Sequence, residues 1–347
     1  MKALMKTRTG YGNLELLDIP EPLVDAAGIL IQVHYAGICG TDLHILHGSY
    51  NCSPPIVLGH ECAGIVKAVG PLVNNVQVHD RVMLLPANGW TCQQCDYCRK
   101  GYYMFCPSRR GLGINMHGCF TKYVVVKEDM VFKVPSGVSL REAALAEPLA
   151  CALQAVEELT PINGGEKVLL SGPGPVGLLC LMMLVEKGCS VIVSGTSQDA
   201  FRLDLARQFG AARVVDIWQE NILEVVSEFT GGYGVDIVFE CSGAPSAVSA
   251  GLQAVRKMGR YIQLGILGSE VELDFDTILF KQLQVFGSYG HSLNTWRKVP
   301  EWMNRRADVL SQLITHVFPL SQWQQAFDLC ENKQCGKVLL YYDGDEM

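Results

Sequence analysis

Four cysteines stand close together in the stretch TCQQCDYCRKGYYMFC, residues 91–106. They are Cys92, Cys95, Cys98 and Cys106. Four thiolates at the spacing C-x2-C-x2-C-x7-C can enclose one tetrahedral Zn2+ as a closed structural site. A disulfide knot and a thioredoxin-like redox pair are the alternatives. The redox pair fits poorly, because three cysteines at C-x-x-C spacing and a fourth lie in a turn-rich region without a helix start. The spacing therefore favours structural zinc.

A second group of polar residues lies in the stretches GICGTDLHILHG (37–48) and LGHECAG (58–64). Cys39 and His60 are ligand types that zinc prefers, and each sits in a turn between β-like runs, where side chains can converge. Alone, each is more often a packed thiol or a hydrogen-bonded core histidine. Further polar side chains stand beside them: Thr41, Asp42, His44 and Glu61. They favour a metal site, because a ligating histidine needs an acceptor for its second nitrogen and a proton needs a route away.

A nucleotide-binding pattern occurs in VLLSGPGPVG, residues 168–177. An apolar strand runs into a G-x-G-x-x-G motif and then into an apolar helix. In that context the glycines let the backbone approach a pyrophosphate, and the helix N-terminus attracts its charge. An ordinary glycine-rich turn is the simpler alternative. The residues of the predicted cradle are Gly172, Gly174, Pro175, Val176 and Gly177.

The elements that must position these residues change in type along the chain. Up to about residue 145, short β-type runs alternate with Gly, Pro and Asn, as in 29–38, 63–70, 80–86 and 121–127. This pattern is typical of a small, mostly β domain built around loops. From about residue 166, strands alternate with helices, which predicts a parallel sheet covered on both faces. Periodicity alone assigns the tail, 315–342, to neither part.

Length and composition exclude several classes of protein. A chain of 347 residues with 49% hydrophobic side chains predicts two domains with substantial cores. The net charge is −7 and basic residues form no run, so binding to nucleic acid or to a membrane is not expected. The N-terminal stretch lacks a signal-peptide pattern, which predicts a cytoplasmic protein with free thiols. The apolar stretch 168–185 contains three glycines and two prolines in its middle, which argues against a membrane span.

Together, AGICGTDLHI, VLGHECAGIV, the four-cysteine lobe and LLSGPGPVGLL resemble, in order and separation, the zinc-containing medium-chain dehydrogenases of the alcohol dehydrogenase superfamily. The resemblance covers essentially the whole chain. It implies an α/β protein with a GroES-like, mostly β catalytic domain over residues 1–150 and a doubly wound Rossmann domain over 151–289. Residues 290–347 are then expected to return to the catalytic domain. The family places its active site between the two domains and usually forms homodimers or homotetramers.

The resemblance also implies roles for single residues. Cys39 and His60 match two ligands of a catalytic zinc, and Asp42 matches the carboxylate that orients the ligating histidine. Thr41 matches the hydroxyl that passes on the substrate proton, and His44 lies further along that relay. Alcohol dehydrogenases supply a further ligand from a cysteine.

In this chain the stretch AALAEPLACALQA carries Glu147 in place of that cysteine. This resembles the sorbitol and polyol dehydrogenases. Their EPL glutamate, here Glu147, lies at the zinc directly or through water, and their GHE glutamate, here Glu61, can ligate the metal. A simpler interpretation of Glu147 is a carboxylate that stabilises a helix N-terminus.

The implied reaction is reversible hydride transfer between a secondary alcohol and NAD(P), with zinc as Lewis acid. The expected alcohol is a polyol or sugar alcohol. L-threonine 3-dehydrogenase is the alternative, because GLGINMHGCFTKY, ECSGAP and LITHVFPL resemble that branch. In it an aspartate replaces Glu147. A non-catalytic zinc and nucleotide sensor is less favoured, because the expected ligands and relay are all present. A quinone-reductase-like enzyme would lack both zinc sites.

The cofactor prediction depends on VIVSGTSQDAFRLDLAR. In NAD-using relatives the second strand ends in an acid that binds the ribose hydroxyls. Here it ends in Ser194, Gly195 and Thr196, which leave room for a 2'-phosphate, and Arg202 can supply countercharge. NADP is therefore favoured slightly over NAD. Asp199, displaced by a longer loop, remains an alternative ribose ligand, and Arg202 then merely lies on the helix surface.

Overall fold

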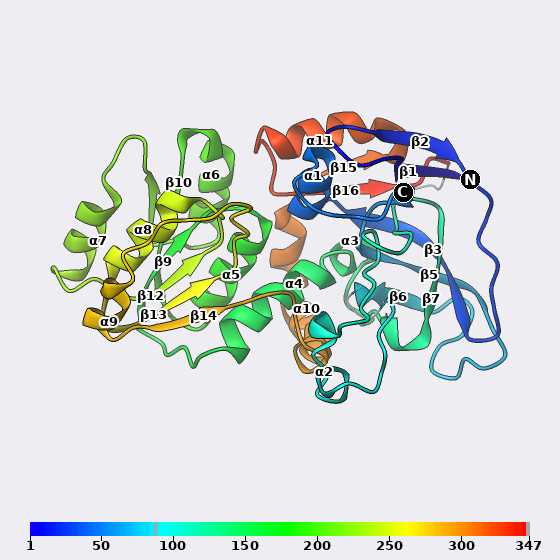
Figure 1. Cartoon of the computed structure of the whole chain (residues 1–347), viewed down its shortest axis with the longest axis horizontal. Helices are drawn as coiled ribbons and strands as arrows, with labels where there is room; N and C mark the ends of the chain where they lie inside the picture. Colours follow the sequence, from blue (N-terminus) through cyan, green and yellow to red (C-terminus); the bar gives the residue numbers. More distant parts are fainter. Residues whose placement is uncertain (87–88, 345–347) are drawn as a thin grey trace. The chain divides into compact units, whose positions relative to one another are not determined.

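A computed structural model describes residues 1–86 and 89–344 of the chain. The described chain forms two compact units. The first contains Met1–Ala150, His291–Glu331 and the residues from Lys337 on, whereas the second contains Cys151–Gly290 and the short segment Asn332–Gly336. Figure 1 colours both units by position in the sequence.

A seven-stranded sheet forms the main framework of the first unit, with the order β15-β16-β3-β5-β6-β8 and with β7 paired to β3. Its strands are β3 (Gly28–Gly37), β5 (Glu61–Val69), β6 (Arg81–Leu84), β7 (Tyr123–Lys127), β8 (Val131–Lys133), β15 (Ile314–Pro319) and β16 (Lys337–Tyr341). A second sheet has the order β2-β1-β4. It contains β1 (Lys2–Lys6), β2 (Leu14–Asp18) and β4 (Ile56–Val57).

Helices and turns of the first unit connect these strands. The helices are α1 (Gly40–His47), α2 (Asp96–Arg99), α3 (Leu140–Ala143), α4 (Ala146–Leu153), which crosses the unit boundary, α10 (Leu293–Leu313) and α11 (Trp323–Glu331). The single-turn segments are η2 (Tyr103–Phe105), η3 (Glu128–Met130) and η6 (Leu320–Gln322).

Strands from the end of the sequence lie inside the first unit's sheet. The antiparallel neighbour of β16 is β3, with Leu339 opposite Gly37, and its parallel neighbour is β15. Figure 1 shows the red β16 beside the blue early strands. The sheet therefore joins segments about 300 positions apart in the sequence.

A six-stranded, fully parallel sheet forms the second unit, with the order β11-β10-β9-β12-β13-β14. Its strands are β9 (Lys167–Ser171), β10 (Ser190–Gly195), β11 (Arg213–Asp216), β12 (Val235–Glu240), β13 (Val255–Gln263) and β14 (Gln284–Gly287). Counted within the sheet, this is the order 3-2-1-4-5-6 of the doubly wound dinucleotide-binding fold, whose order reverses beside β9.

The strands of the second unit alternate with helices. These are η4 (Gln154–Glu158), α5 (Pro175–Glu186), η5 (Ser197–Asp199), α6 (Ala200–Gln208), α7 (Ile222–Thr230), α8 (Pro245–Ala254) and α9 (Asp276–Lys281). One buried cluster joins strand residues Leu169, Ile192 and Val238 to Val226 of α7 and Leu252 of α8. Helices α7 and α8 therefore pack on one face of the sheet through apolar side chains. A parallel sheet requires such cover.

The predicted fold class is confirmed: a mostly β unit and a parallel α/β unit have the architecture expected from the two sequence patterns. The apolar stretch 168–185 forms strand β9, the glycine-rich turn and most of helix α5. Among the described residues, no helix has both the length and the apolar character needed to span a bilayer.

Candidate metal and dinucleotide sites

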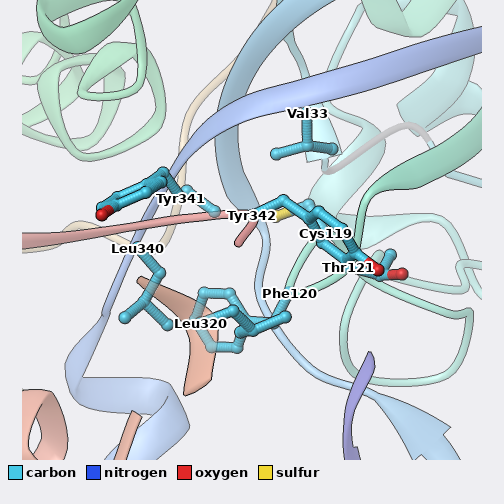
Figure 2. Close-up of a pocket in the computed structure, with 9 residues that line it drawn as sticks. Val33, Cys119, Phe120, Thr121, Leu320, Leu340, Tyr341 and Tyr342 are labelled. Carbon is cyan, nitrogen blue, oxygen red and sulfur yellow. The ribbon is translucent and has the colours of Figure 1, made fainter. Parts of the chain in front are cut away.

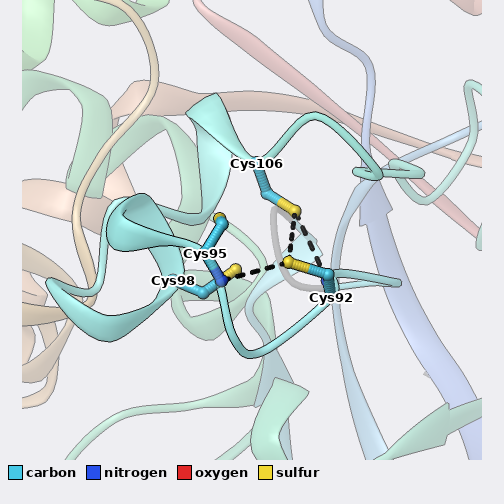
Figure 3. Close-up of side chains that lie close together, drawn as sticks. All are labelled: Cys92, Cys95, Cys98 and Cys106. Carbon is cyan, nitrogen blue, oxygen red and sulfur yellow. Dashed lines mark hydrogen bonds between the residues drawn. The ribbon is translucent and has the colours of Figure 1, made fainter.

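The four cysteines of the stretch 91–106 lie together in the first unit (Figure 3). Helix α2 begins directly after Cys95, and the turn η2 ends just before Cys106, so two tight turns fold the stretch back on itself. The four sulfur atoms all lie within 4.8 Å of one another, and Cys92 Sγ is 3.7 Å from Cys106 Sγ. The Cys92 sulfur also accepts a hydrogen bond of 3.3 Å from the Cys95 amide.

This geometry suits a zinc ion better than a disulfide. A tetrahedral zinc with Zn–S bonds of about 2.3 Å separates its sulfur ligands by about 3.8 Å, whereas bonded sulfurs lie about 2.05 Å apart. All fourteen cysteines of the chain are free thiols. Backbone amides of Gln94 and Cys95 lower the pKa of Cys92 to about 6, whereas burial and its cysteine neighbours raise the pKa of Cys98 to about 12. A cation is therefore needed to hold four thiolates together.

A second cluster is built where two antiparallel strands end together. Gly37, the last residue of β3, lies opposite Glu61, the first residue of β5. Cys39 follows β3 as the N-cap of α1, and His60 immediately precedes β5. The ligand atoms of Cys39, His60 and Glu61 consequently all lie within 4.8 Å of one another. One sulfur, one imidazole and one carboxylate form a donor set that suits Zn2+.

Asp42, in the first turn of α1, lies near His60 and is fully buried. Its Oδ2 accepts a 2.9 Å hydrogen bond from the Cys39 amide, which fixes the start of α1. Its Oδ1 is 4.0 Å from His60 Nδ1, longer than a hydrogen bond, and neither atom has another hydrogen-bond partner among the described residues. A small approach of the two side chains would orient the imidazole, as the sequence predicted for Asp42.

The electrostatics of the cluster favour a cation. Burial lowers the pKa of His60, but the Cys39 sulfur and the carboxylates of Asp42 and Glu147 more than offset it and hold that pKa well above its usual range. Burial raises the pKa of Asp42. Negative groups thus surround the imidazole, and several buried polar atoms have no hydrogen-bond partner in the described chain: Asp42 Oδ1, His60 Nδ1 and Glu61 Oε1. Asp42 Oδ1 and His60 Nδ1 face each other, whereas a bound metal would satisfy Glu61 Oε1.

Lys337 supplies a counter-ion for Glu61 that the sequence analysis missed. Its Nζ contacts Glu61 Oε2 and donates a 2.8 Å hydrogen bond to the Ile38 carbonyl, and both charged side chains are buried. Burial lowers the pKa of Lys337, but Glu61 and the Cys39 sulfur raise it above its ordinary value. A Cβ on Gly37 would lie 2.2 Å from Glu61 Oε2 and 2.7 Å from Lys337 Cε, so glycine leaves the space for this pair.

Replacing Lys337 by methionine should destabilise the protein by about 3–5 kcal/mol, because the Glu61 carboxylate would remain buried without its partner. Urea unfolding of the protein with its structural zinc in place measures this change. Lys133→Met, which removes a largely exposed partner of Asp80, should have little effect. A Lys337→Met protein as stable as the wild type would mean that Glu61 is not held as a charged group.

A third polar group extends the cluster. Glu147 lies in the first turn of α4, with Cys151 one helical turn further on. His291 Nε2 is 3.8 Å from Glu147 Oε1, its side chain is 1% exposed, and neither ring nitrogen has a hydrogen-bond partner among the described residues. Burial, with the nearby Arg109, lowers the pKa of His291 to about 3, so the imidazole is neutral. The sequence analysis missed His291 and Cys151, because a single histidine in GSYGHSLNTW carries no spacing signal.

The two relay residues predicted from the sequence lie on one helix. Thr41 Oγ1 is 3.7 Å from Cys39 Sγ, at the start of α1. His44 follows three positions later, is partly exposed, and has Nδ1 3.3 Å from Ser49 Oγ. Residues at i and i+3 share a helix face, so Thr41 and His44 lead from the cluster toward the surface.

The glycine-rich turn of the second unit fits a pyrophosphate. Gly172 has φ +96° and follows β9, and a Cβ there would meet the Ser242 amide at 2.6 Å. A Cβ on Gly177 would lie 2.2 Å from the Gly172 carbonyl, so α5 packs tightly on the turn. Gly174 is the N-cap of α5, and a Cβ there would meet nothing within 4 Å. Open space in front of a helix N-terminus that starts with Pro175 is what a phosphate group requires.

The turn after β10 contains the residues predicted to select the cofactor. Ser194 Oγ donates a 3.2 Å hydrogen bond to Ser171 Oγ, and Gly195 ends the strand. Thr196 and Asp199 form a capping box. Arg202 Nε donates a 2.9 Å hydrogen bond to the Cys335 carbonyl rather than only covering the helix surface.

A small cavity in the first unit is lined by residues other than the predicted site residues (Figure 2). Its volume is about 10 Å3, which is room for about one water molecule. Its lining residues are Val33, Ala36, Cys119, Phe120, Thr121, Leu320, Leu340, Tyr341 and Tyr342. A cavity of this size holds no substrate.

Comparison with known protein families identifies the class of protein to which this fold belongs. Residues 25–136 match the alcohol dehydrogenase GroES-like domain, and residues 175–305 match the zinc-binding dehydrogenase domain. The chain belongs to the zinc-containing medium-chain dehydrogenases of the alcohol dehydrogenase superfamily.

Similar proteins include several polyol and amino-acid dehydrogenases. The chain is 37% identical to sorbitol dehydrogenase of Halalkalibacterium halodurans, over 98% of this chain and 99% of that protein. It is 37% identical to D-arabitol-phosphate dehydrogenase of Enterococcus avium, over 100% and 99%, and 35% identical to L-threonine 3-dehydrogenase of Bacillus subtilis, over 98% of each.

Among solved structures of similar proteins, one contains NADP and another contains NADH. A zinc-binding dehydrogenase of Sinorhizobium meliloti 1021 bound to NADP has a TM-score of 0.84 and 29% identity, over 98% of each chain. An alcohol dehydrogenase of Escherichia coli CFT073 complexed with NADH has a TM-score of 0.88 and 28% identity, over 99% of each chain.

Proposed function

We propose that this protein is a zinc-dependent dehydrogenase that oxidises a secondary hydroxyl of a polyol or sugar alcohol, and reduces the corresponding ketone, with NAD(P). The single observation that carries this proposal is the convergence of Cys39, His60 and Glu61, with Glu147 near enough to influence the pKa of His60. Bound zinc would supply Lewis acidity, and the nicotinamide would accept or donate the hydride.

The residues of the chain hold the reactants and conduct the proton. Cys39, His60 and Glu61 or Glu147 would hold the metal, and Asp42 would orient His60. Thr41 Oγ1, beside Cys39 Sγ, would accept the proton of the substrate hydroxyl as it gives up its own hydroxyl proton, and His44 would carry that proton toward water. The four cysteines of the stretch 91–106 would hold a structural zinc.

A polyol rather than a simple alcohol is supported by His291. Its neutral imidazole lies beside Glu147 with two nitrogens that have no hydrogen-bond partner in the described chain. One of these nitrogens can donate a hydrogen bond to a second substrate hydroxyl or accept one from it. The names of the sorbitol and arabitol-phosphate relatives support the same substrate class.

Polyols should therefore exceed simple secondary alcohols in kcat/KM by about 100-fold, since an unfilled hydrogen-bonding site disfavours a substrate that lacks the second hydroxyl. Absorbance of the reduced cofactor, followed with sugar alcohols, 2-butanol and L-threonine, measures this ratio. His291→Leu should lower polyol turnover and leave 2-butanol turnover nearly unchanged. Efficient oxidation of L-threonine with weak polyol turnover would instead establish the L-threonine 3-dehydrogenase alternative.

NADP is proposed as the preferred cofactor, because β10 ends in Ser194 and Gly195, with Thr196 after them, and has no acid there. Gly195→Asp is a poor test of this preference. A Cβ on Gly195 would lie 3.1 Å from Asp199 Cβ and 3.2 Å from Pro173, so the substitution would strain the turn as well as add charge. The binding constants of the wild type for NADPH and NADH test the preference directly.

Assembly and location are separate expectations. A homodimer or homotetramer is proposed from the family, and light scattering of the purified protein measures its mass. The cytoplasmic location likewise stays a prediction from the sequence, which cell fractionation tests.

A further inference from the structure

A short segment from late in the sequence belongs to the dinucleotide-binding unit. Residues Asn332–Gly336 lie between α11 and β16, yet they form part of the second unit. Arg202 of α6 holds them there: its Nε donates a 2.9 Å hydrogen bond to the Cys335 carbonyl, and its Nη2 lies 3.9 Å from Cys335 Sγ. Arg202 thus fixes the position of the neighbouring Lys333.

Lys333 reaches the turn that follows β10. Its Nζ is 3.2 Å from Asp199 Oδ2, and the side chain is 34% exposed. The same carboxylate oxygen accepts hydrogen bonds from the Thr196 amide at 3.0 Å and the Thr196 hydroxyl at 2.8 Å. Asp199 is 6% exposed, and these three donors outweigh burial and keep its pKa below the usual value.

This arrangement determines which groups can bind the adenosine ribose of a dinucleotide. In dinucleotide-binding folds, an acid about 20 residues beyond the glycine motif accepts the ribose hydroxyls. The turn 195–199 occupies that place, but its one carboxylate, Asp199, points inward and is already hydrogen bonded. The ammonium of Lys333 has three N–H donors and the bond to Asp199 uses one, so it can also meet an anion.

We propose that Lys333 is a cofactor-selectivity residue: it keeps Asp199 turned away from the ribose and binds the 2'-phosphate of NADP directly. Arg202 acts through it, as the positioning residue that fixes the segment 332–336. This inference rests on the proposed NADP preference and extends it from the strand end to a residue far along the chain. Lysine binds phosphate as a compact point charge and needs no planar geometry.

Cofactor binding without substrate tests this proposal. Fluorescence titration with NADPH and NADH, and calorimetry with 2',5'-ADP and 5'-AMP, depend on neither zinc nor the alcohol. Lys333→Met should weaken NADPH and 2',5'-ADP binding at least about tenfold, because a charge-assisted hydrogen bond is lost. NADH binding should be no weaker than in the wild type, because Asp199 is then less restrained from turning toward the ribose. Lys333→Arg should keep most of the preference. Lys187→Met is the matched control, since Lys187 is 32% exposed and pairs with Glu157 in the same unit.

A double variant separates direct contact from simple neutralisation of Asp199. Asparagine also caps turns, so Asp199→Asn should preserve the turn and bind NADPH at least as tightly as the wild type. If Lys333 contacts the phosphate, Lys333→Met with Asp199→Asn should remain weak for NADPH. Recovery of wild-type affinity in the double variant would overturn the direct contact.

The remaining outcomes distinguish this inference from the proposed function. A wild type that prefers NADPH, with Lys333→Met equal to it, would refute the role of Lys333 and leave the NADP proposal intact. A wild type that prefers NADH would refute both the NADP proposal and the role of Lys333, but not the dehydrogenase activity. Failure to bind either cofactor would refute the dehydrogenase proposal itself.

Discussion

Replacing His60 by alanine should lower kcat/KM for the best polyol by at least about 1000-fold, because the substrate hydroxyl would lose the Lewis acid that makes it acidic. The zinc content measured by metal analysis should fall from two ions per chain to one, because the four-cysteine cluster is separate from His60. NADPH binding and the melting temperature should stay near wild type, because the dinucleotide-binding residues belong to the other unit. The steady-state oxidation rate is the primary measurement.

Two further variants are controls for the loss of activity in His60→Ala. His47→Ala removes an exposed histidine of α1 that pairs with Glu331, and should leave the rate nearly unchanged. Glu147→Gln should be milder than His60→Ala, because it keeps Cys39, His60 and Glu61 in place. Near wild-type turnover by His60→Ala would show that the metal mechanism is wrong.

Replacing Cys95 by serine should cause the largest loss of stability. Structural zinc contributes about 10–16 kcal/mol in small zinc-binding peptides, which is comparable with the whole stability of a domain, about 5–15 kcal/mol. We expect most of the variant to be insoluble, and any soluble fraction to melt at least about 10 °C lower. Thermal unfolding followed by circular dichroism, together with zinc analysis, measures both effects.

Cys52→Ser is the matched control, because Cys52 is also partly exposed but lies outside the metal clusters. It should retain wild-type solubility and zinc content. A soluble Cys95→Ser protein with unchanged melting temperature and unchanged metal would contradict the zinc assignment. Mass spectrometry that found disulfides in the wild-type lobe would contradict it as well.

Local patterns predicted much of the fold and part of the site. The four cysteines are close in sequence, so turns of a few residues bring their sulfurs together without help from distant segments. The β-α alternation predicted the parallel sheet, because short connections restrict how successive strands can pair. The glycine motif of residues 172–177 likewise lies within one turn. Gly172 and Gly177 stand where a Cβ would clash with nearby backbone, so a local sequence motif was enough to indicate the close packing there.

Groups that meet through long-range pairing were missed. Lys337 reaches Glu61 only because β16 lies beside β3. His291 reaches Glu147 from a segment about 140 residues away, and Lys333 reaches Asp199 through the contact of Cys335 with Arg202. Single polar residues in such segments carry no periodicity, so a sequence without an alignment does not identify them.

The cofactor turn shows an intermediate case. The sequence predicts that the second strand of the Rossmann domain ends without an acid, and β10 ends in Ser194 and Gly195, but the sequence pattern does not place Asp199. The pattern Thr-x-x-Asp at residues 196–199 is a capping-box pattern, and the structure forms that box. This local signal was available in the sequence and would have indicated that Asp199 faces its own turn.

The interior position of β16 has a consequence for how the protein is made. Ribosomes synthesise the chain from its N-terminus, and domains generally fold as units during synthesis. Strand β3 and residues Cys39, His60 and Glu61 emerge early, yet their neighbours β16 and Lys337 emerge after nearly the whole chain has been translated. The segment 151–290 can fold while the first unit still lacks part of its sheet. During that interval Glu61 has no counter-ion from Lys337. A zinc ion bound before the chain leaves the ribosome would therefore meet Cys39, His60 and Glu61 without Lys337 beside them.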